Sequence, residues 1–72
     1  MDTQKLIYFI AAVKHLNFTK AANECHIAQT AMSRYISSLE RELGFQLFYR
    51  DNRNVSLTAA GESFYQEAVL LT

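Results

Sequence analysis

The chain has 72 residues, half of them hydrophobic, with five Phe, four Tyr and no Pro; this is enough for one small globular domain and excludes a disordered chain. A single cysteine excludes an internal disulfide and favours a reducing compartment, which we take to be the cytoplasm. No hydrophobic run approaches the roughly 18 residues of a membrane span, and seven basic against seven acidic residues give zero net charge.

The first predicted helix covers residues 3–15. Its hydrophobic side chains, from Leu6 to Val13, recur at helical spacing. Asp2 or Thr3 can cap its start through a side-chain oxygen. The wide hydrophobic face indicates a helix packed against two neighbours.

A second, short helix is predicted over about 18–25, with Asn17 as its N-cap. Residues 26–28 then form a turn, and a third helix follows over about 29–43. Gly44 stands at the position where a left-handed residue commonly ends a helix. The two helices and the turn predict a helix-turn-helix.

The third helix has two different faces. Its hydrophobic stripe is made of Met32, Ile36, Leu39 and Leu43. Its opposite side carries Thr30, Arg34, Ser37, Ser38 and Arg41, with Gln29 and Ser33 flanking them near the N-terminal end, and these seven residues are here called the polar face. Hydroxyl, amide and guanidinium groups suit base edges and phosphates, so we expect this helix to enter the major groove of DNA.

A hairpin, or wing, is predicted next. Residues 47–49 and 55–57 have strand character, and the residues between them favour a turn. Arg50 and Arg53 are expected at the tip. Thr58 is then the expected N-cap of a fourth helix that begins at residue 59.

The fourth helix carries two hydrophobic faces. One contains Phe64, Ala68 and Leu71, and the other contains Tyr65 and Val69. One face can pack on its own domain, and the other needs a partner. Because the pattern runs to the last residue without a stop signal, we expect a longer helix that pairs with its counterpart in a dimer.

Several polar residues have both a binding and a non-binding interpretation. Gln29 suits an adenine edge, and Arg34 suits a guanine edge or a phosphate, against the alternative of solvated side chains. Thr19 and Lys20 stand at a helix N-terminus that can receive a phosphate. Tyr35 is open between a phosphate contact and packing.

The same two interpretations apply to the serines and to the wing. Ser33, Ser37 and Ser38 can donate to phosphates or remain solvated. Arg53 can enter the minor groove or be freely solvated. For Cys25 and His26, adjacent in the chain, a core thiol and a turn imidazole are favoured over catalysis or metal binding, because the sequence positions no third ligand or acid.

Five short motifs occur in register along the chain. They are Phe18-Thr19-x-Ala21-Ala22, Gln29-x-Ala31-x-Ser33-Arg34-x-Ile36, Leu39-Glu40-x-Glu42-Leu43-Gly44, Leu47-Phe48-x-Arg50 and Leu57-Thr58-x-Ala60-Gly61. With these motifs the chain resembles, over essentially its whole length, the N-terminal DNA-binding domain of LysR-type transcriptional regulators.

The resemblance implies a mainly α fold, the winged helix-turn-helix, with a three-helix core, a small wing and a long linker helix. Residues 1–58 would form the DNA-binding domain, and 59–72 the start of the linker helix. Gln29, Ser33 and Arg34 match DNA-contacting positions of the recognition helix, and Arg50 and Arg53 match basic wing positions. The chain departs from the family at Ala28, usually serine, at Thr30, usually proline, and in the wing at Asn52, Asn54 and Ser56.

The resemblance also implies partners. These are double-stranded DNA with an inverted-repeat operator, a second copy through the linker helix, and a higher oligomer in the full-length protein. A small-molecule effector would bind only a C-terminal domain absent from this chain. No cofactor, metal or membrane is expected.

The neutral net charge supports a different class of function, because DNA-binding domains are usually basic. Residues 1–39 carry an excess of two positive charges and residues 59–72 an excess of two negative charges, which permits DNA binding without demonstrating it. A helical protein-interaction module therefore stays as the alternative. An enzyme is the weakest hypothesis, since no convergent titratable groups are predicted.

Overall fold

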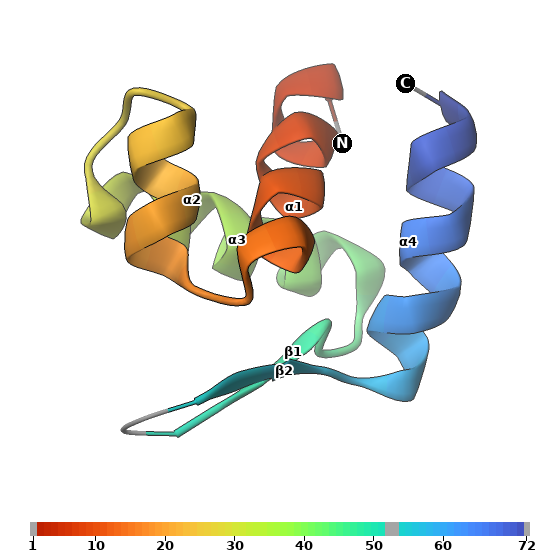
Figure 1. Cartoon of the computed structure of the whole chain (residues 1–72). Helices are drawn as coiled ribbons and strands as arrows, with labels where there is room; N and C mark the ends of the chain where they lie inside the picture. The colour runs from red at the N-terminus through yellow and green to blue at the C-terminus, as the bar shows by residue number, and fades with distance from the viewer. Residues whose placement is uncertain (1, 52–53, 72) are drawn as a thin grey trace.

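The computed structural model describes residues 2–51 and 54–71 (Figure 1). Within them the elements are α1 (Thr3–His15), α2 (Phe18–Glu24), α3 (Gln29–Leu43), β1 (Phe48–Arg50), β2 (Val55–Leu57) and α4 (Ala59–Leu71). The predicted bounds of the first and third helices are confirmed, while α2 ends one residue early and β1 begins one residue late. The mainly α winged helix-turn-helix is the observed fold.

The helix ends follow local capping chemistry. The side chain of Asp2 accepts a hydrogen bond from the backbone N–H of Lys5, and that of Asn17 accepts from Lys20, both at 2.9 Å. Ala28 occupies the N-cap of α3 and makes no side-chain hydrogen bond. Gly44 ends α3 in the left-handed region, with φ 84°. All four cap positions agree with the sequence prediction.

The turn between α2 and α3 is tight. His26 adopts a left-handed conformation with φ 59°, which the sequence did not predict. The backbone N–H of Ile27 then donates to the carbonyl of Ala22 at 3.0 Å, and the Ile27 side chain packs against the core. The turn therefore fixes the direction in which α3 leaves α2.

Phe9 of α1 lies at the centre of the hydrophobic core. It is fully buried, and its ring centroid lies 5.3 Å from that of Phe64 and 5.7 Å from that of Phe48. The buried stripe of α3 consists of Met32, Ile36 and Leu39, with Leu43 packed at its edge. Helix α1 lies between α2 and α4, as Figure 1 shows. Its Phe9 side chain joins three parts of the fold, namely α1, β1 and α4.

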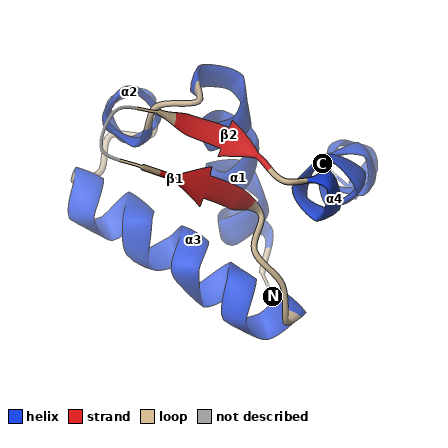
Figure 2. Ribbon diagram, turned by 90° about the horizontal axis from the view of Figure 1, so that it is seen from below, coloured by secondary structure: helices blue, strands red, loops and turns tan. Residues whose placement is uncertain are grey.

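The wing is a two-stranded antiparallel hairpin that lies beside α3 (Figure 2). Phe48 pairs with Leu57, and Arg50 pairs with Val55. Below the tip, Asp51 and Asn54 exchange hydrogen bonds, including one of 2.6 Å from the Asn54 N–H to the Asp51 carboxylate. The hairpin was predicted, but Asn52 and Arg53 at its tip lie outside the described residues.

A set of polar contacts, here called the junction, joins α3, the wing and α4 through Glu40, Leu47, Thr58 and Gly61. Glu40 Oε2 accepts from the backbone N–H of Leu47 at 2.7 Å and from that of Phe48 at 3.2 Å. Its other oxygen pairs with Arg50 at 3.0 Å. One carboxylate of α3 thereby holds the start of the wing.

Thr58 and Gly61 form the α4 side of the junction. The Thr58 hydroxyl donates to the carbonyl of Gln46 at 2.7 Å and accepts from the Gly61 N–H at 2.8 Å, which confirms its predicted capping role. A Cβ at Gly61 would lie 2.2 Å from the Leu47 carbonyl oxygen. Only glycine lets the first turn of α4 approach the wing this closely.

The two hydrophobic faces of α4 have different surroundings. Phe64 and Ala68 are buried in the core of this chain, and Tyr65 packs half-buried beside Phe9. Val69 and Leu71 remain exposed. In the described part of the chain, no helix has the length and hydrophobicity needed to span a membrane.

Candidate nucleic-acid interface

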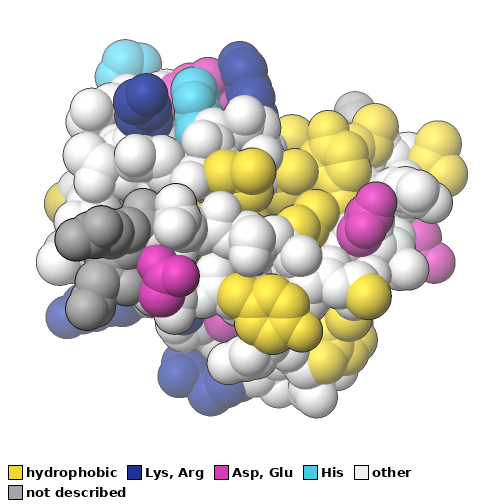
Figure 3. Space-filling model, turned by 60° about the horizontal axis from the view of Figure 1, so that its bottom comes forward, with side chains coloured by type: hydrophobic (Ala, Val, Ile, Leu, Met, Phe, Trp, Pro, Cys, Tyr) yellow, Lys and Arg dark blue, Asp and Glu magenta, His cyan; other side chains and the backbone are white. Residues whose placement is uncertain are grey.

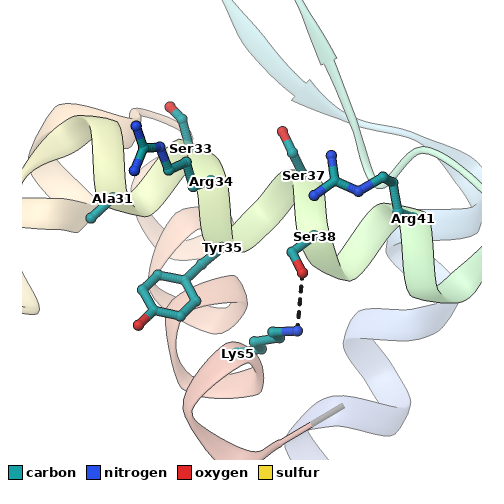
Figure 4. A pocket seen from close by; sticks show the side chains of 8 residues that line it. All are labelled: Lys5, Ala31, Ser33, Arg34, Tyr35, Ser37, Ser38 and Arg41. Atoms are coloured by element: carbon teal, nitrogen blue, oxygen red, sulfur yellow. Dashed lines mark hydrogen bonds between the residues drawn. The ribbon is translucent and has the colours of Figure 1, made fainter.

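Two open hollows flank the polar face of α3. The first, the wing hollow, lies between the starts of α2 and α3 and the hairpin. The second, the helix hollow, runs along α3 on the side of α1 (Figure 4). Ser33 lines both hollows, so the two meet at this residue of the polar face.

The wing hollow brings together four predicted site residues from three elements: Thr19 of α2, Gln29 and Ser33 of α3, and Arg50 of β1. They are separated in sequence but share one surface, because the hairpin folds back beside the start of α3. Asn17, Asp51 and Asn54 also line this hollow. The sequence had identified them only as cap and turn residues.

The helix hollow holds the other basic part of the polar face. Arg34, Ser37 and Arg41 line it, and Figure 4 shows them on one side of α3 with Ser33. Of these, Arg41 was recognised as part of the polar face but not as a predicted DNA contact. Two glutamates flank Arg41 in sequence, so the sequence alone does not show that its charge is uncompensated.

Lys20 and Thr30 are exposed on the first turns of α2 and α3. Thr30 adds a hydroxyl and a methyl group to the polar face. Arg53 lies outside the described residues, so its predicted minor-groove contact stays a prediction.

Arg50 has internal partners as well as a place in the wing hollow. Its guanidinium donates to Glu40 and lies 5.1 Å from the centroid of the Phe18 ring. A guanidinium held by a carboxylate and an aromatic face is fixed in place. Arg50 therefore joins the wing to α2 and α3.

Ion pairing divides the cations of the described residues into two groups. One group is paired across elements: Lys5–Glu42, Lys14–Glu24 and Arg50–Glu40. In the part of the chain that the structure describes, no ion pair is formed by Lys20, Arg34 and Arg41. The zero net charge thus conceals an uneven surface, and two of the three uncompensated cations lie on the polar face.

Figure 3 shows, with the bottom of the molecule turned forward, how the types of side chain are distributed over the surface. Hydrophobic side chains gather on the side that carries α4, and the Lys and Arg side chains lie on the other half. Two of the paired acids have lowered pKa values. The Lys5 ammonium lowers the pKa of Glu42 to about 2, and His15 together with Lys14 lowers the pKa of Glu24.

Tyr35 packs against α1, which confirms the packing interpretation of its side chain. Its ring centroid lies 4.7 Å from that of Tyr8, whose hydroxyl accepts from Gln4 Nε2 at 2.7 Å. Tyr35 is 36% exposed and also lines the helix hollow, so packing leaves an edge of it on the surface.

Cys25 and His26 provide no reactive centre. Burial, reinforced by the charge of Glu24, raises the pKa of the Cys25 thiol, which disfavours the nucleophilic thiolate. Among the described residues, no three His, Cys, Asp or Glu side chains are grouped as metal ligands. The site chemistry is that of hydrogen-bond donors and cations on an exposed helix.

Comparison with known proteins extends this description. Residues 3–62 match the family model of the bacterial regulatory helix-turn-helix proteins, lysR family. The chain is 45% identical over 71 residues to the Hca operon transcriptional activator HcaR of Escherichia coli (strain K12), covering 99% of this chain and 24% of that protein. It is 48% identical over 71 residues to the regulator BenM of Acinetobacter baylyi, covering 99% and 23%. It therefore spans about a quarter of the length of these relatives.

Two solved structures are similar to it. The DNA-binding domain of CbnR in a DNA complex has a TM-score of 0.95 at 37% identity, over 99% of this chain and 82% of that one. The DNA-binding domain of BenM with benA site 1 DNA has a TM-score of 0.93 at 48% identity, over 99% and 80%. Both carry the same winged helix-turn-helix, and the matching family comprises regulators rather than enzymes.

Proposed function

The chain belongs to the lysR family of bacterial regulatory helix-turn-helix proteins, and from this we propose that it is the sequence-specific DNA-binding part of a transcriptional regulator. The observation that carries the proposal is the exposed polar face of α3, where Arg34 forms no ion pair within the described residues. The similar domains of CbnR and BenM are described as complexes with DNA.

In this proposal α3 is the recognition helix. The 15 residues of α3 give it a length of about 22 Å. The major groove of B-DNA is wide enough to admit an α-helix. Gln29 and Arg34, both in the first half of α3, would meet base edges, with the hydroxyls of Thr30 and Ser33 beside them. Ser37 would reach the phosphates that border the groove.

The wing hollow would place the neighbouring phosphates. Thr19 and Lys20 open α2, whose first N–H groups and dipole favour an anion. Because Arg50 is held by Glu40 and Phe18, we assign it to positioning the wing, with part of its surface open to the hollow. Arg53 is proposed as the minor-groove contact.

We further propose that the regulator is a dimer through α4. Val69 and Leu71 leave hydrophobic surface at the end of α4, with Tyr65 half-buried beside the core. A two-fold dimer would place two recognition helices one helical turn, or a multiple of it, apart on an inverted-repeat operator. Higher assembly and effector binding would depend on a further domain of the full-length protein, located in the cytoplasm with its DNA.

A titration of labelled duplex DNA by fluorescence anisotropy tests the proposal. We expect affinity to fall steeply with salt, by a log–log slope of about −0.9 for each neutralised phosphate. Arg34→Ala should weaken binding markedly and relax base preference, with an unchanged melting temperature. Lys14→Ala is the matched control, since it removes an equal charge from a paired site away from α3.

Salt-independent binding that ignores Arg34→Ala would overturn the proposal and favour the protein-interaction module. The support for that alternative was the neutral net charge. The ion pairs weaken this support, because they place three of the seven acids against Lys5, Lys14 and Arg50 rather than against the arginines of the polar face.

A further inference from the structure

We propose that Arg41 is a second phosphate-binding arginine, which lets the last turns of α3 hold the DNA backbone while the first turns read bases. The proposal rests on the proposed function and adds to it a contact at a position that the motif Leu39-Glu40-x-Glu42 leaves open. Arg41 lies in the last turn of α3 and is exposed.

The spacing of Arg34 and Arg41 puts both on one side of the helix. Seven residues make almost two full turns and a rise of about 10.5 Å. Both line the helix hollow, and Figure 4 shows their side chains on the same side of α3, with Ser37 between them. This is a distance over which one helix can meet base edges at one arginine and the bordering backbone at the other.

The charge of Arg41 is uncompensated although a glutamate stands on each side of it in sequence. Glu40 directs its carboxylate to the Leu47 and Phe48 N–H groups and to Arg50. Glu42 pairs with Lys5 of α1. Across the described residues Arg41 makes neither an ion pair nor a side-chain hydrogen bond.

The groups around Arg41 suit a phosphodiester. A guanidinium offers several N–H donors in a plane that matches phosphate oxygens. Ser38 Oγ accepts from Lys5 Nζ at 3.0 Å, which leaves its own proton available to donate. The helix hollow therefore lines up a cation and hydroxyl donors, and none of the described residues that line it carries a carboxylate.

A structural role competes with this assignment, because a cation in the last turn of a helix interacts favourably with the helix dipole. That role predicts a change in stability without a change in salt dependence. The phosphate contact predicts a change in the salt dependence of binding without a change in stability.

The experiment compares Arg41→Gln with Lys14→Gln in the 72-residue chain, using labelled duplexes of mixed sequence and of a selected operator. Arg41→Gln should lower the salt slope by about one on both duplexes and weaken binding equally on both, since a phosphate contact carries no base preference. Lys14→Gln should leave the slope at the wild-type value. Thermal unfolding of each variant checks that the fold is retained.

The outcomes separate the proposal for Arg41 from the DNA-binding proposal on which it rests. If Arg34→Ala weakens binding and Arg41→Gln keeps the wild-type slope, Arg41 is a helix-end residue only, and the DNA-binding proposal stands. A loss of discrimination between operator and mixed sequence in Arg41→Gln would also overturn the phosphate assignment. If the wild-type chain shows no salt-dependent binding, the DNA-binding proposal fails, and this one fails with it.

Discussion

At the junction, Glu40 uses both carboxylate oxygens and Thr58 uses its hydroxyl as donor and acceptor, so these groups are occupied within the chain. On the polar face of the same α3, Arg34 and Arg41 form no ion pair with any described residue. Both regions are rich in polar side chains. What distinguishes them is whether the hydrogen-bonding capacity is used internally or remains available to a ligand.

Gly61→Ala is the change expected to disturb the junction most. The added Cβ would lie 2.2 Å from the Leu47 carbonyl oxygen, so α4 must move away from the wing. We expect the free energy of unfolding to fall by about 3 kcal/mol, measured by urea denaturation. Gly44→Ala is the control, because an added Cβ at Gly44 would meet nothing within 4 Å. Its only cost is that alanine is strained at the left-handed φ, which should lower the free energy of unfolding by about 1 kcal/mol. Equal effects at both glycines would show that the close approach is unimportant.

Glu40→Gln tests whether the junction depends on charge. An amide has one accepting oxygen and no charge for Arg50, so we expect a loss of about 2 kcal/mol in the free energy of unfolding. Glu67→Gln, at an exposed position of α4, should change it by less than about 0.5 kcal/mol. A Glu40 variant as stable as the Glu67 variant would remove the distinction between the two regions.

Ala28→Ser tests the smallest effect, at the start of the polar face. A hydroxyl at this N-cap can accept from the first turn of α3, and we expect stabilisation of about 1 kcal/mol, seen as a higher urea midpoint with unchanged slope. Asn17→Ala is the reciprocal variant, since it removes an existing cap and should destabilise by a similar amount. An unchanged midpoint for Ala28→Ser would show that water already satisfies these N–H groups.

Much of the fold could be predicted because it is encoded locally. Periodic hydrophobic residues, Asn17 and Thr58 as caps and Gly44 as a helix end fixed the element bounds to within one residue. The sequence did not decide which hydrophobic face of α4 packs on its own domain. Both faces of that helix are hydrophobic, and only the packing of α1 against it decides which one is buried.

The candidate site was predicted in its residue types and less well in its organisation. Helical spacing placed Arg34 on the polar side of the helix, with Gln29 and Ser33 flanking it. In the structure Gln29 lines the wing hollow, Arg34 lines the helix hollow and Ser33 lines both. The partner of Arg50 could not be predicted, because Glu40 reaches it only once the wing is folded back. Arg41 was underestimated for the same reason, since its two acidic neighbours are occupied by contacts that depend on the tertiary fold.

The pairing of Lys5, Lys14 and Arg50 with carboxylates also has a kinetic consequence. At physiological ionic strength, charges are screened beyond about 8 Å, and a molecule of zero net charge attracts a distant polyanion weakly. The uncompensated arginines act only near contact. Association with DNA should then proceed at an ordinary diffusional rate without long-range steering, and added salt should act mainly by shortening the lifetime of the complex.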